Sequence, residues 1–174
     1  GPGVAARLGI DYDTLKAINP RLVYCSISGF GACGPMSAGK GYDVILQAFT
    51  GMLSITGELG GNSVRSPFSP VDQATGMHAL TGILAALYEG RETKQGQKIE
   101  VSLFDTATAF LGYFLQAFWE RGTEPEKPGS GHESLCPYEI FMTSDKPLIL
   151  GVANDSLWRK FCDLAGLQKY VEDP

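Results

Sequence analysis

The feature that most constrains this chain is a long helix predicted over residues 71–89, VDQATGMHALTGILAALYE. Small and apolar residues occupy most of its circumference, whereas a surface helix confines its apolar residues to one stripe. We therefore expect this helix to be buried. It must lie among other elements that cover it.

Strands and helices alternate around that helix. Residues 21–28, RLVYCSIS, form a continuous β-rich run that is typical of a buried strand, and KIEVSL at residues 98–103 is a second one. Further helices are expected at residues 13–18, 42–56 and 104–121. Such alternation predicts an α/β fold in layers.

A second, smaller α+β unit is expected after a Gly/Pro-rich loop at residues 122–137. Strands near 138–142 and 147–152 predict a hairpin, and Asn154 or Asp155 is placed to cap a last helix that Gly166 ends. The predicted domains are therefore residues 1–122, part of a larger domain, and residues 123–174, the start of a small one.

Composition excludes several classes of function. The net charge is −5 and lysines and arginines do not cluster, which argues against nucleic-acid binding. No apolar run approaches the ~20 residues of a membrane span. Four widely spaced cysteines without a CxxC pair predict free thiols. A cytoplasmic protein is expected.

Three motifs that would indicate other chemistry are incomplete or absent. Gly29 to Gly34, GFGACG, matches the dinucleotide pattern GxGxxG, but Pro35 and more loop follow it in place of the helix that would meet a pyrophosphate. We interpret it as a turn. His78 stands alone, and His132-Glu133 lacks the second histidine of HExxH, so no metal site is predicted. No GxSxG is present to support a serine hydrolase.

Asp72 is the candidate for chemistry. It lies at the start of the helix over residues 71–89, after Pro67 and Pro70, where the helix dipole favours an ionised carboxylate. An aspartate at a helix start is also a common cap, and periodicity alone favours the cap over catalysis.

Several ordered blocks resemble the class III CoA-transferases, which include formyl-CoA, carnitine-CoA and succinyl-CoA:carboxylate transferases and the related α-methylacyl-CoA racemases. The blocks are ARLGIDYDTLKAINPRLVYCSISGFGACGP, GKGYDVILQAFTGMLSITG, VDQATGMHALTGILAAL and GQKIEVSLFD. The resemblance implies that Asp72 attacks the thioester and forms a mixed anhydride. A positioned, desolvated carboxylate would divide a difficult exchange into easier steps.

The resemblance also implies contacts with coenzyme A, which is a substrate here and not a permanently bound cofactor. Arg7 and Lys40 match family cations that contact CoA, whose phosphates require positive charge. Tyr42 and Asp43 match positions that line the active site, and Leu103 matches an apolar CoA contact. Gly129 and Gly131 match a glycine-rich loop that closes over the intermediates, although Ser130 interrupts the run here.

Family members begin with a Rossmann-like βα unit and continue well beyond Pro174, so the chain resembles an internal fragment of a Rossmann-like CoA-transferase domain. The implied function is acyl-CoA:carboxylate CoA transfer with a small carboxylic acid, in an interlocked homodimer or higher oligomer. Two alternatives stay open: an α-methylacyl-CoA racemase-like enzyme and a non-catalytic acyl-CoA-binding fragment. Racemases typically carry histidine at the position of Tyr42, which favours transfer.

Overall fold

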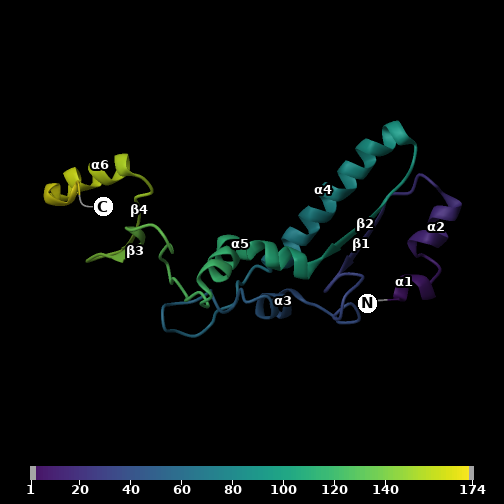
Figure 1. The fold of residues 1–174 in the computed structure, drawn as a ribbon, viewed down its shortest axis with the longest axis horizontal. Helices are drawn as coiled ribbons and strands as arrows, with labels where there is room; N and C mark the ends of the chain where they lie inside the picture. Colours follow the sequence, from purple (N-terminus) through teal and green to yellow (C-terminus); the bar gives the residue numbers. More distant parts are fainter. Residues whose placement is uncertain (1–2, 173–174) are drawn as a thin grey trace. The chain divides into compact units, whose positions relative to one another are not determined.

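The computed structural model describes residues 3–172 of the 174-residue chain. The chain divides into two compact units, each of which is described by itself. The first comprises the N-terminal part through Ile55 together with Val64–Pro125. The second comprises Thr56–Ser63 and the residues from Glu126 onward. Figure 1 labels their helices and strands.

The first unit is built on two parallel strands, β1 (Tyr24–Ser28) and β2 (Lys98–Ser102), paired from Tyr24↔Lys98 to Ser28↔Ser102. Parallel neighbours need a crossover connection, and α3 (Asp43–Phe49) and α4 (Pro70–Thr93) provide it. The predicted α/β fold is confirmed. Both predicted strands are present, although β1 is shorter than expected.

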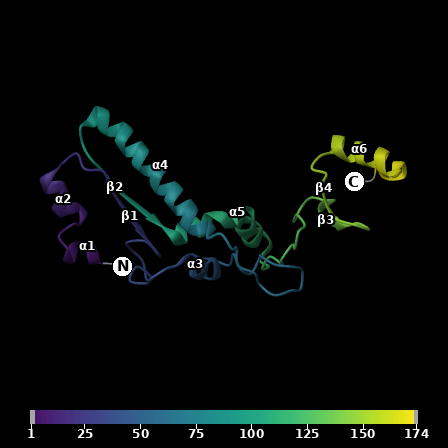
Figure 2. The same ribbon diagram turned by 180° about the vertical axis from the view of Figure 1, so that it is seen from behind.

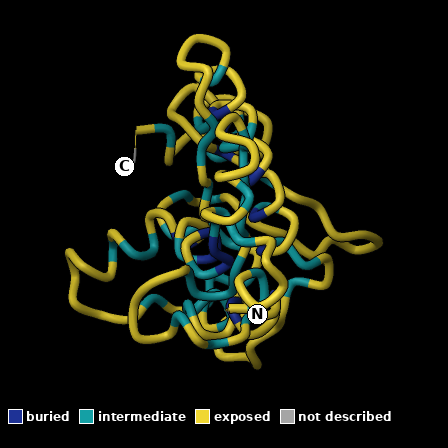
Figure 3. The backbone as a smooth tube through the Cα atoms, turned by 90° about the vertical axis from the view of Figure 1, so that its right-hand side faces the viewer, coloured by how far each residue is buried: buried dark blue, intermediate teal, exposed yellow. Residues whose placement is uncertain are grey.

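Helix α4 lies along one face of these strands, as the two opposite views of Figures 1 and 2 show. At Gly82 the approach is close, because a Cβ there would lie 2.9 Å from Cγ2 of Ile99 on β2. Helix α5 (Leu103–Arg121) begins directly after β2. Leu46, Val71, Leu103 and Ala107 form the buried core where α3, α4 and α5 meet. Figure 3 colours the buried parts of the backbone dark blue.

The expectation that the helix at 71–89 is buried all round is wrong for this chain. Helix α4 buries only one stripe, which comprises Val71, Thr75, Ala79 and Ala86. Large apolar side chains on its other side are more than half exposed: Met77, Leu80, Leu84, Leu87 and Tyr88. No described element of the first unit covers that side, so sequence periodicity alone overestimated its burial.

Local signals set most of the other helix ends. Helix α1 covers Val4–Arg7, and α2 (Tyr12–Ile18) begins at Asp11, whose carboxylate accepts a hydrogen bond from the Thr14 N–H at 3.1 Å. Helix α3 stops at Phe49, short of the predicted Thr56. The reason is Gly51, whose φ of 92° is left-handed and terminates the helix.

The second unit contains the predicted hairpin, with β3 (Tyr138–Met142) antiparallel to β4 (Pro147–Gly151). Helix α6 (Asp155–Ala165) follows, and a 3-10 turn at Gln168–Tyr170 ends the described chain. Asn154 caps α6 by accepting from the Leu157 N–H at 3.0 Å, and Gly166 ends the helix, as predicted. From residue 3 to residue 172, no helix has the length and apolar character needed to cross a membrane.

Candidate functional site

An open groove of about 760 Å³ lies at the carboxyl end of β1. Ligands in open α/β sheets bind outside the carboxyl ends of the strands, so its place in the fold is that of a ligand site. The lining residues include Ser26 and Ser28 from β1, the segment 37–42 that leads to α3, Glu100 from β2 and Leu103 at the start of α5.

Two glycines let the backbone form this groove. The end of β1 and the segment before α3 cross so closely that a Cβ on Gly29 would lie 2.6 Å from the Gly41 nitrogen. A Cβ on Gly41 would in turn lie 2.5 Å from Cδ2 of Leu46 in the core. Only glycines fit this crossing.

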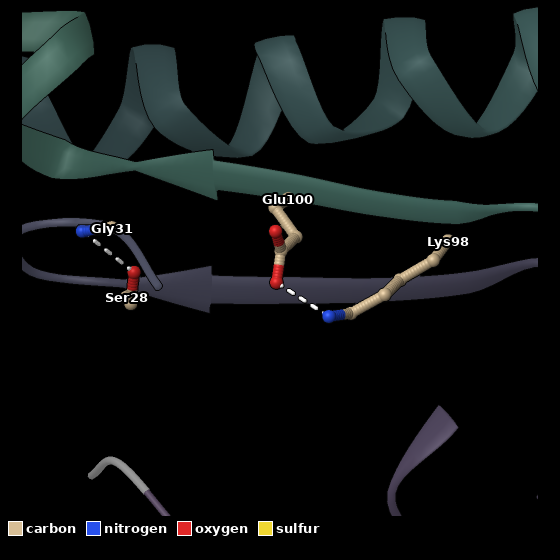
Figure 4. Close-up of polar contacts among 4 residues, drawn as sticks. All are labelled: Ser28, Gly31, Lys98 and Glu100. Carbon is tan, nitrogen blue, oxygen red and sulfur yellow. Dashed lines mark hydrogen bonds and ion pairs between the residues drawn. The ribbon is translucent and has the colours of Figure 1, made fainter. Parts of the chain in front are cut away.

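The glycine motif after β1 forms a turn, in agreement with the sequence-based interpretation. The Gly31 N–H donates to Ser28 Oγ at 3.1 Å, closing the turn directly at the strand end (Figure 4). The next helix is α3, which starts only at Asp43. This segment therefore presents no helix N-terminus to a pyrophosphate.

The charges on β2 near the groove are paired. Lys98 Nζ lies 2.7 Å from Glu100 Oε1, and Figure 4 shows both side chains on the face opposite α4. The hydrogen bond with Glu100 and its charge raise the pKa of Lys98. The ion pair is half-exposed, so it adds little stability. Its effect on the site is to offset the negative charge of Glu100 there.

Three of the predicted site residues come together in the groove: Lys40, Tyr42 and Leu103. Tyr42 is the residue before α3 and is 69% exposed, so its ring and hydroxyl are open to a ligand. Leu103 is the first residue of α5 and is 8% exposed, so it serves the core as well as the wall of the groove.

Asp43 lies next to Tyr42 but is buried, at 5% exposure, and is not in the groove lining. Its Oδ2 accepts hydrogen bonds from two N–H groups in the first turn of α4, Val71 at 2.8 Å and Asp72 at 3.1 Å. These are the second and third helical positions, which a capping residue usually serves. Asp43 therefore caps α4 from a distant part of the chain.

Asp72 occupies the third position of α4, with its side chain on the exposed side of the helix. Partial desolvation and then the charge of Asp43 raise its pKa. No described residue forms a hydrogen bond or ion pair with its carboxylate. The capping hypothesis for Asp72 is wrong, because α4 begins before it, with Ser69 at the N-cap position, and Asp43 accepts the N–H groups of the first turn.

The remaining predicted residues lie elsewhere. Arg7 is exposed at the end of α1 and is not in the groove lining, although Ala5 of the same helix is. Gly129 and Gly131 belong to the second unit. The Gly131 N–H donates to the Pro128 carbonyl at 2.9 Å, so it is engaged within its own turn.

Sequence reasoning missed several residues of the site. Ser26, Ser28 and Glu100 line the groove, and Gln47 donates through its side-chain amide to Asp43 Oδ1. The serines are two positions apart near the end of a strand, a spacing that places them on one face and could have identified them. Gln47 gave no such signal. Residues 3–172 contain no group of three or more metal-ligating side chains placed to hold an ion.

Comparison with known proteins connects this geometry to a family. The model of CoA-transferase family III matches residues 1–174. An acyl-CoA transferase of Fusarium pseudograminearum is 39% identical over 173 residues, covering 99% of this chain and 38% of that protein. A succinate–glutarate CoA-transferase of Agrobacterium fabrum is 37% identical over 168 residues, covering 97% of this chain and 42% of that protein.

A solved structure agrees with these matches. The crystal structure of a CAIB/BAIF family protein from Brucella suis has 33% sequence identity and a TM-score of 0.81, covering 98% of this chain and 45% of that one. The chain thus spans less than half the length of each of these relatives.

Proposed function

Since the chain belongs to CoA-transferase family III, we propose that the full-length protein transfers coenzyme A from an acyl-CoA thioester to a small carboxylic acid, with Asp72 as the nucleophile. One observation carries the proposal. Tyr42 lines the groove, and its neighbour Asp43 holds the first turn of α4 on which the unbonded Asp72 carboxylate is exposed. Groove and nucleophile are thereby linked through two adjacent residues.

The first half of the reaction releases the donor acid. The Asp72 carboxylate attacks the thioester carbonyl, the C–S bond breaks, and CoA leaves as a thiolate, giving a mixed anhydride of Asp72 and the acyl group. The thiolate then attacks the aspartyl carbonyl of this anhydride. The donor carboxylate leaves, and Asp72 carries CoA as a thioester.

The second half runs these steps in reverse with the acceptor. The acceptor carboxylate attacks the aspartyl thioester, releasing the thiolate and forming a second mixed anhydride. The thiolate attacks the acceptor's carbonyl, which gives the new acyl-CoA and restores the Asp72 carboxylate. Every atom comes from the two substrates and Asp72, so neither a resident cofactor nor a redox partner is required.

The residues that line the groove support binding of a CoA thioester there. Lys40 supplies a cation for phosphate, and the exposed Tyr42 and the apolar Leu103 supply contact area. Pairing with Lys98 offsets the charge of Glu100, which would otherwise repel the phosphates. Arg7 is proposed as a further phosphate contact from α1, and the loop with Gly129 and Gly131 as a cover for the intermediates. The cytoplasm remains the predicted compartment.

The succinate–glutarate relative from A. fabrum bears the names of two small carboxylic acids, which supports a carboxylate acceptor here.

Racemisation within the family would need a base opposite Asp72. We expect the full-length protein, incubated with a chiral 2-methylacyl-CoA in deuterated water without an acceptor acid, to leave the α-proton in place. Mass spectrometry measures the exchange. Rapid deuterium incorporation would contradict transferase function and support the racemase alternative.

The proposed assembly is a homodimer or higher oligomer. The exposed apolar side of α4 favours association, because large apolar patches on soluble proteins mark contact surfaces. We expect the 174-residue chain to self-associate in sedimentation velocity over a wide concentration range. Leu84→Glu, on that side of α4, should weaken association, whereas the same change at Ile149 on β4 is the matched control. A clean monomer at all concentrations would contradict the prediction.

A further inference from the structure

The buried carboxylate of Asp43 is surrounded by hydrogen-bond donors. Oδ2 accepts from the Val71 N–H at 2.8 Å and the Asp72 N–H at 3.1 Å, and Oδ1 accepts from the side-chain amide of Gln47. Gln47 is itself buried, at 1% exposure. Both oxygens of Asp43 thus accept hydrogen bonds, which fixes the carboxylate in one orientation.

Gln47 cannot turn to offer its oxygen to Asp43 instead. Its Oε1 accepts from the Ser66 N–H at 3.0 Å, so its nitrogen is the atom that faces Asp43. Every partner of Asp43 is therefore a donor. An asparagine in place of Asp43 would direct its own amide protons at an N–H group, so only a carboxylate satisfies all three donors.

We propose that Asp43 is the positioning residue of the Asp72 nucleophile: it fixes the first turn of α4 by accepting two N–H groups and places a second negative charge beside the reacting carboxylate. This inference rests on the proposed function. It assigns Asp43 a role in setting the reactivity of Asp72 and not a contact with coenzyme A.

Three consequences of this geometry favour nucleophilic attack. The Asp72 N–H donates to Asp43, which fixes the backbone position from which the Asp72 side chain extends. The N–H groups of Val71 and Asp72 donate to Asp43 and not to the Asp72 carboxylate. The Asp43 charge also raises the pKa of Asp72, after desolvation. A more basic, unbonded carboxylate is a better nucleophile.

No other charged group has a comparable influence on Asp72. Among the elements packed against α4, α3 carries only Asp43 as a titratable residue. The others carry Tyr24 and Cys25 on β1, Lys98 and Glu100 on β2, and Asp105, Tyr113, Glu120 and Arg121 on α5. Of all these charges, only that of Asp43 shifts the pKa of Asp72. Changing Asp43 therefore removes the one neighbouring charge that shifts the pKa of Asp72.

The test compares Asp43→Asn with the wild type in the full-length protein. Turnover and hydroxamate trapping at Asp72 are measured as functions of pH. Without the neighbouring charge, Asp72 ionises at lower pH, so the acid limb of both profiles should move to lower pH. Turnover should fall roughly ten- to hundredfold, because the first turn of α4 is less well held. A residue that only stabilised the fold would leave the acid limb in place.

Two further variants complete the design. Asp11→Asn makes the same change at a cap in the same unit, on α2, and should keep the wild-type pH profile. Gln47→Leu keeps the Asp43 charge but removes its donor, so turnover should fall while the acid limb stays unmoved. If Asp43→Asn fails to fold, the turnover of Gln47→Leu still tests the positioning role of Asp43.

The outcomes separate the inference from the proposed function. If the wild type carries no hydroxamate on Asp72, the proposed function fails. If the wild type is labelled but a folded Asp43→Asn keeps its rate and acid limb, or Gln47→Leu keeps full turnover, the positioning role of Asp43 is overturned and the proposed function stands.

Discussion

Asp72→Asn in the full-length protein is expected to lose turnover by several orders of magnitude and yet to be more stable than the wild type at neutral pH. The substitution keeps the size of the side chain but removes its charge and its nucleophilicity. Losing a nucleophile costs far more in rate than any loss of a local contact. Coenzyme A binding should persist, since Lys40, Tyr42 and Leu103 are unchanged.

The gain in stability follows from the raised pKa of Asp72. A carboxyl group whose folded pKa lies above its unfolded value stabilises the fold at pH below the unfolded value, and that contribution is lost as pH rises through the folded pKa. At neutral pH the ionised Asp72 is therefore a cost to folding, modest because the side chain is exposed. Urea unfolding of wild type and Asp72→Asn at neutral and acidic pH measures this difference.

Asp11→Ala is the matched control, and its effect on stability at neutral pH should have the opposite sign. The hydrogen bonds from the Thr14 side chain and N–H lower the pKa of Asp11, so its contribution to stability is present above the unfolded pKa and lost as pH falls through the folded one. Its replacement should destabilise the protein at neutral pH and leave turnover intact. Opposite signs for two helix-start aspartates would confirm that Asp72 is not a cap.

Chemical trapping tests the intermediate itself. Wild-type protein incubated with acyl-CoA and then hydroxylamine should carry a hydroxamate on the peptide containing Asp72, because a mixed anhydride is an electrophile that ordinary carboxylates never present. Mass spectrometry locates the label, and Asp72→Ala should lack both label and turnover. Wild-type-like turnover in Asp72→Asn would exclude Asp72 as the nucleophile.

Gly29→Ala is expected to destabilise the protein by about 1–3 kcal/mol or more and to weaken coenzyme A binding. The new Cβ would lie 2.6 Å from the nitrogen and 2.8 Å from the Cα of Gly41, and both are backbone atoms. Relief requires moving one of the two segments that form the groove. The Gly29 carbonyl also accepts from the Phe104 N–H at 2.9 Å, so the start of α5 would be disturbed too.

Gly76→Ala is the matched control for stability. Gly76 lies within α4, and a Cβ there would meet nothing within 4 Å. Alanine should therefore stabilise the helix by about 1 kcal/mol, its advantage over glycine in a helix interior. Urea unfolding followed by circular dichroism gives both values, and calorimetric titration with coenzyme A gives the affinity. A Gly29→Ala protein as stable as the wild type would show that the crossing with Gly41 can relax.

The sequence alone determined the features that depend on near neighbours. The cap predicted at Asn154 or Asp155 and the stop at Gly166 bounded α6 correctly, and the turn between β3 and β4 was located. The alternation of strands and helices predicted the α/β fold. The residues after Gly29 were recognised as a turn because a prolyl residue, and not a helix, follows. Capping and turn formation act over a few residues, so the local sequence contains the required information.

The tertiary structure decided the roles of the two aspartates. Local rules favour Asp72 as a cap, but α4 begins before it, and Asp43, 29 residues earlier in the chain, accepts the Asp72 N–H. The same structure brought Lys40 and Leu103 to one groove and left Arg7 off its lining. Neither result follows from the spacing of residues in the sequence. Whether two distant segments form a hydrogen bond or line the same groove depends on the path of the chain between them. At this site the path depends on the crossing of Gly29 and Gly41, which places the start of α3 where Asp43 can reach α4.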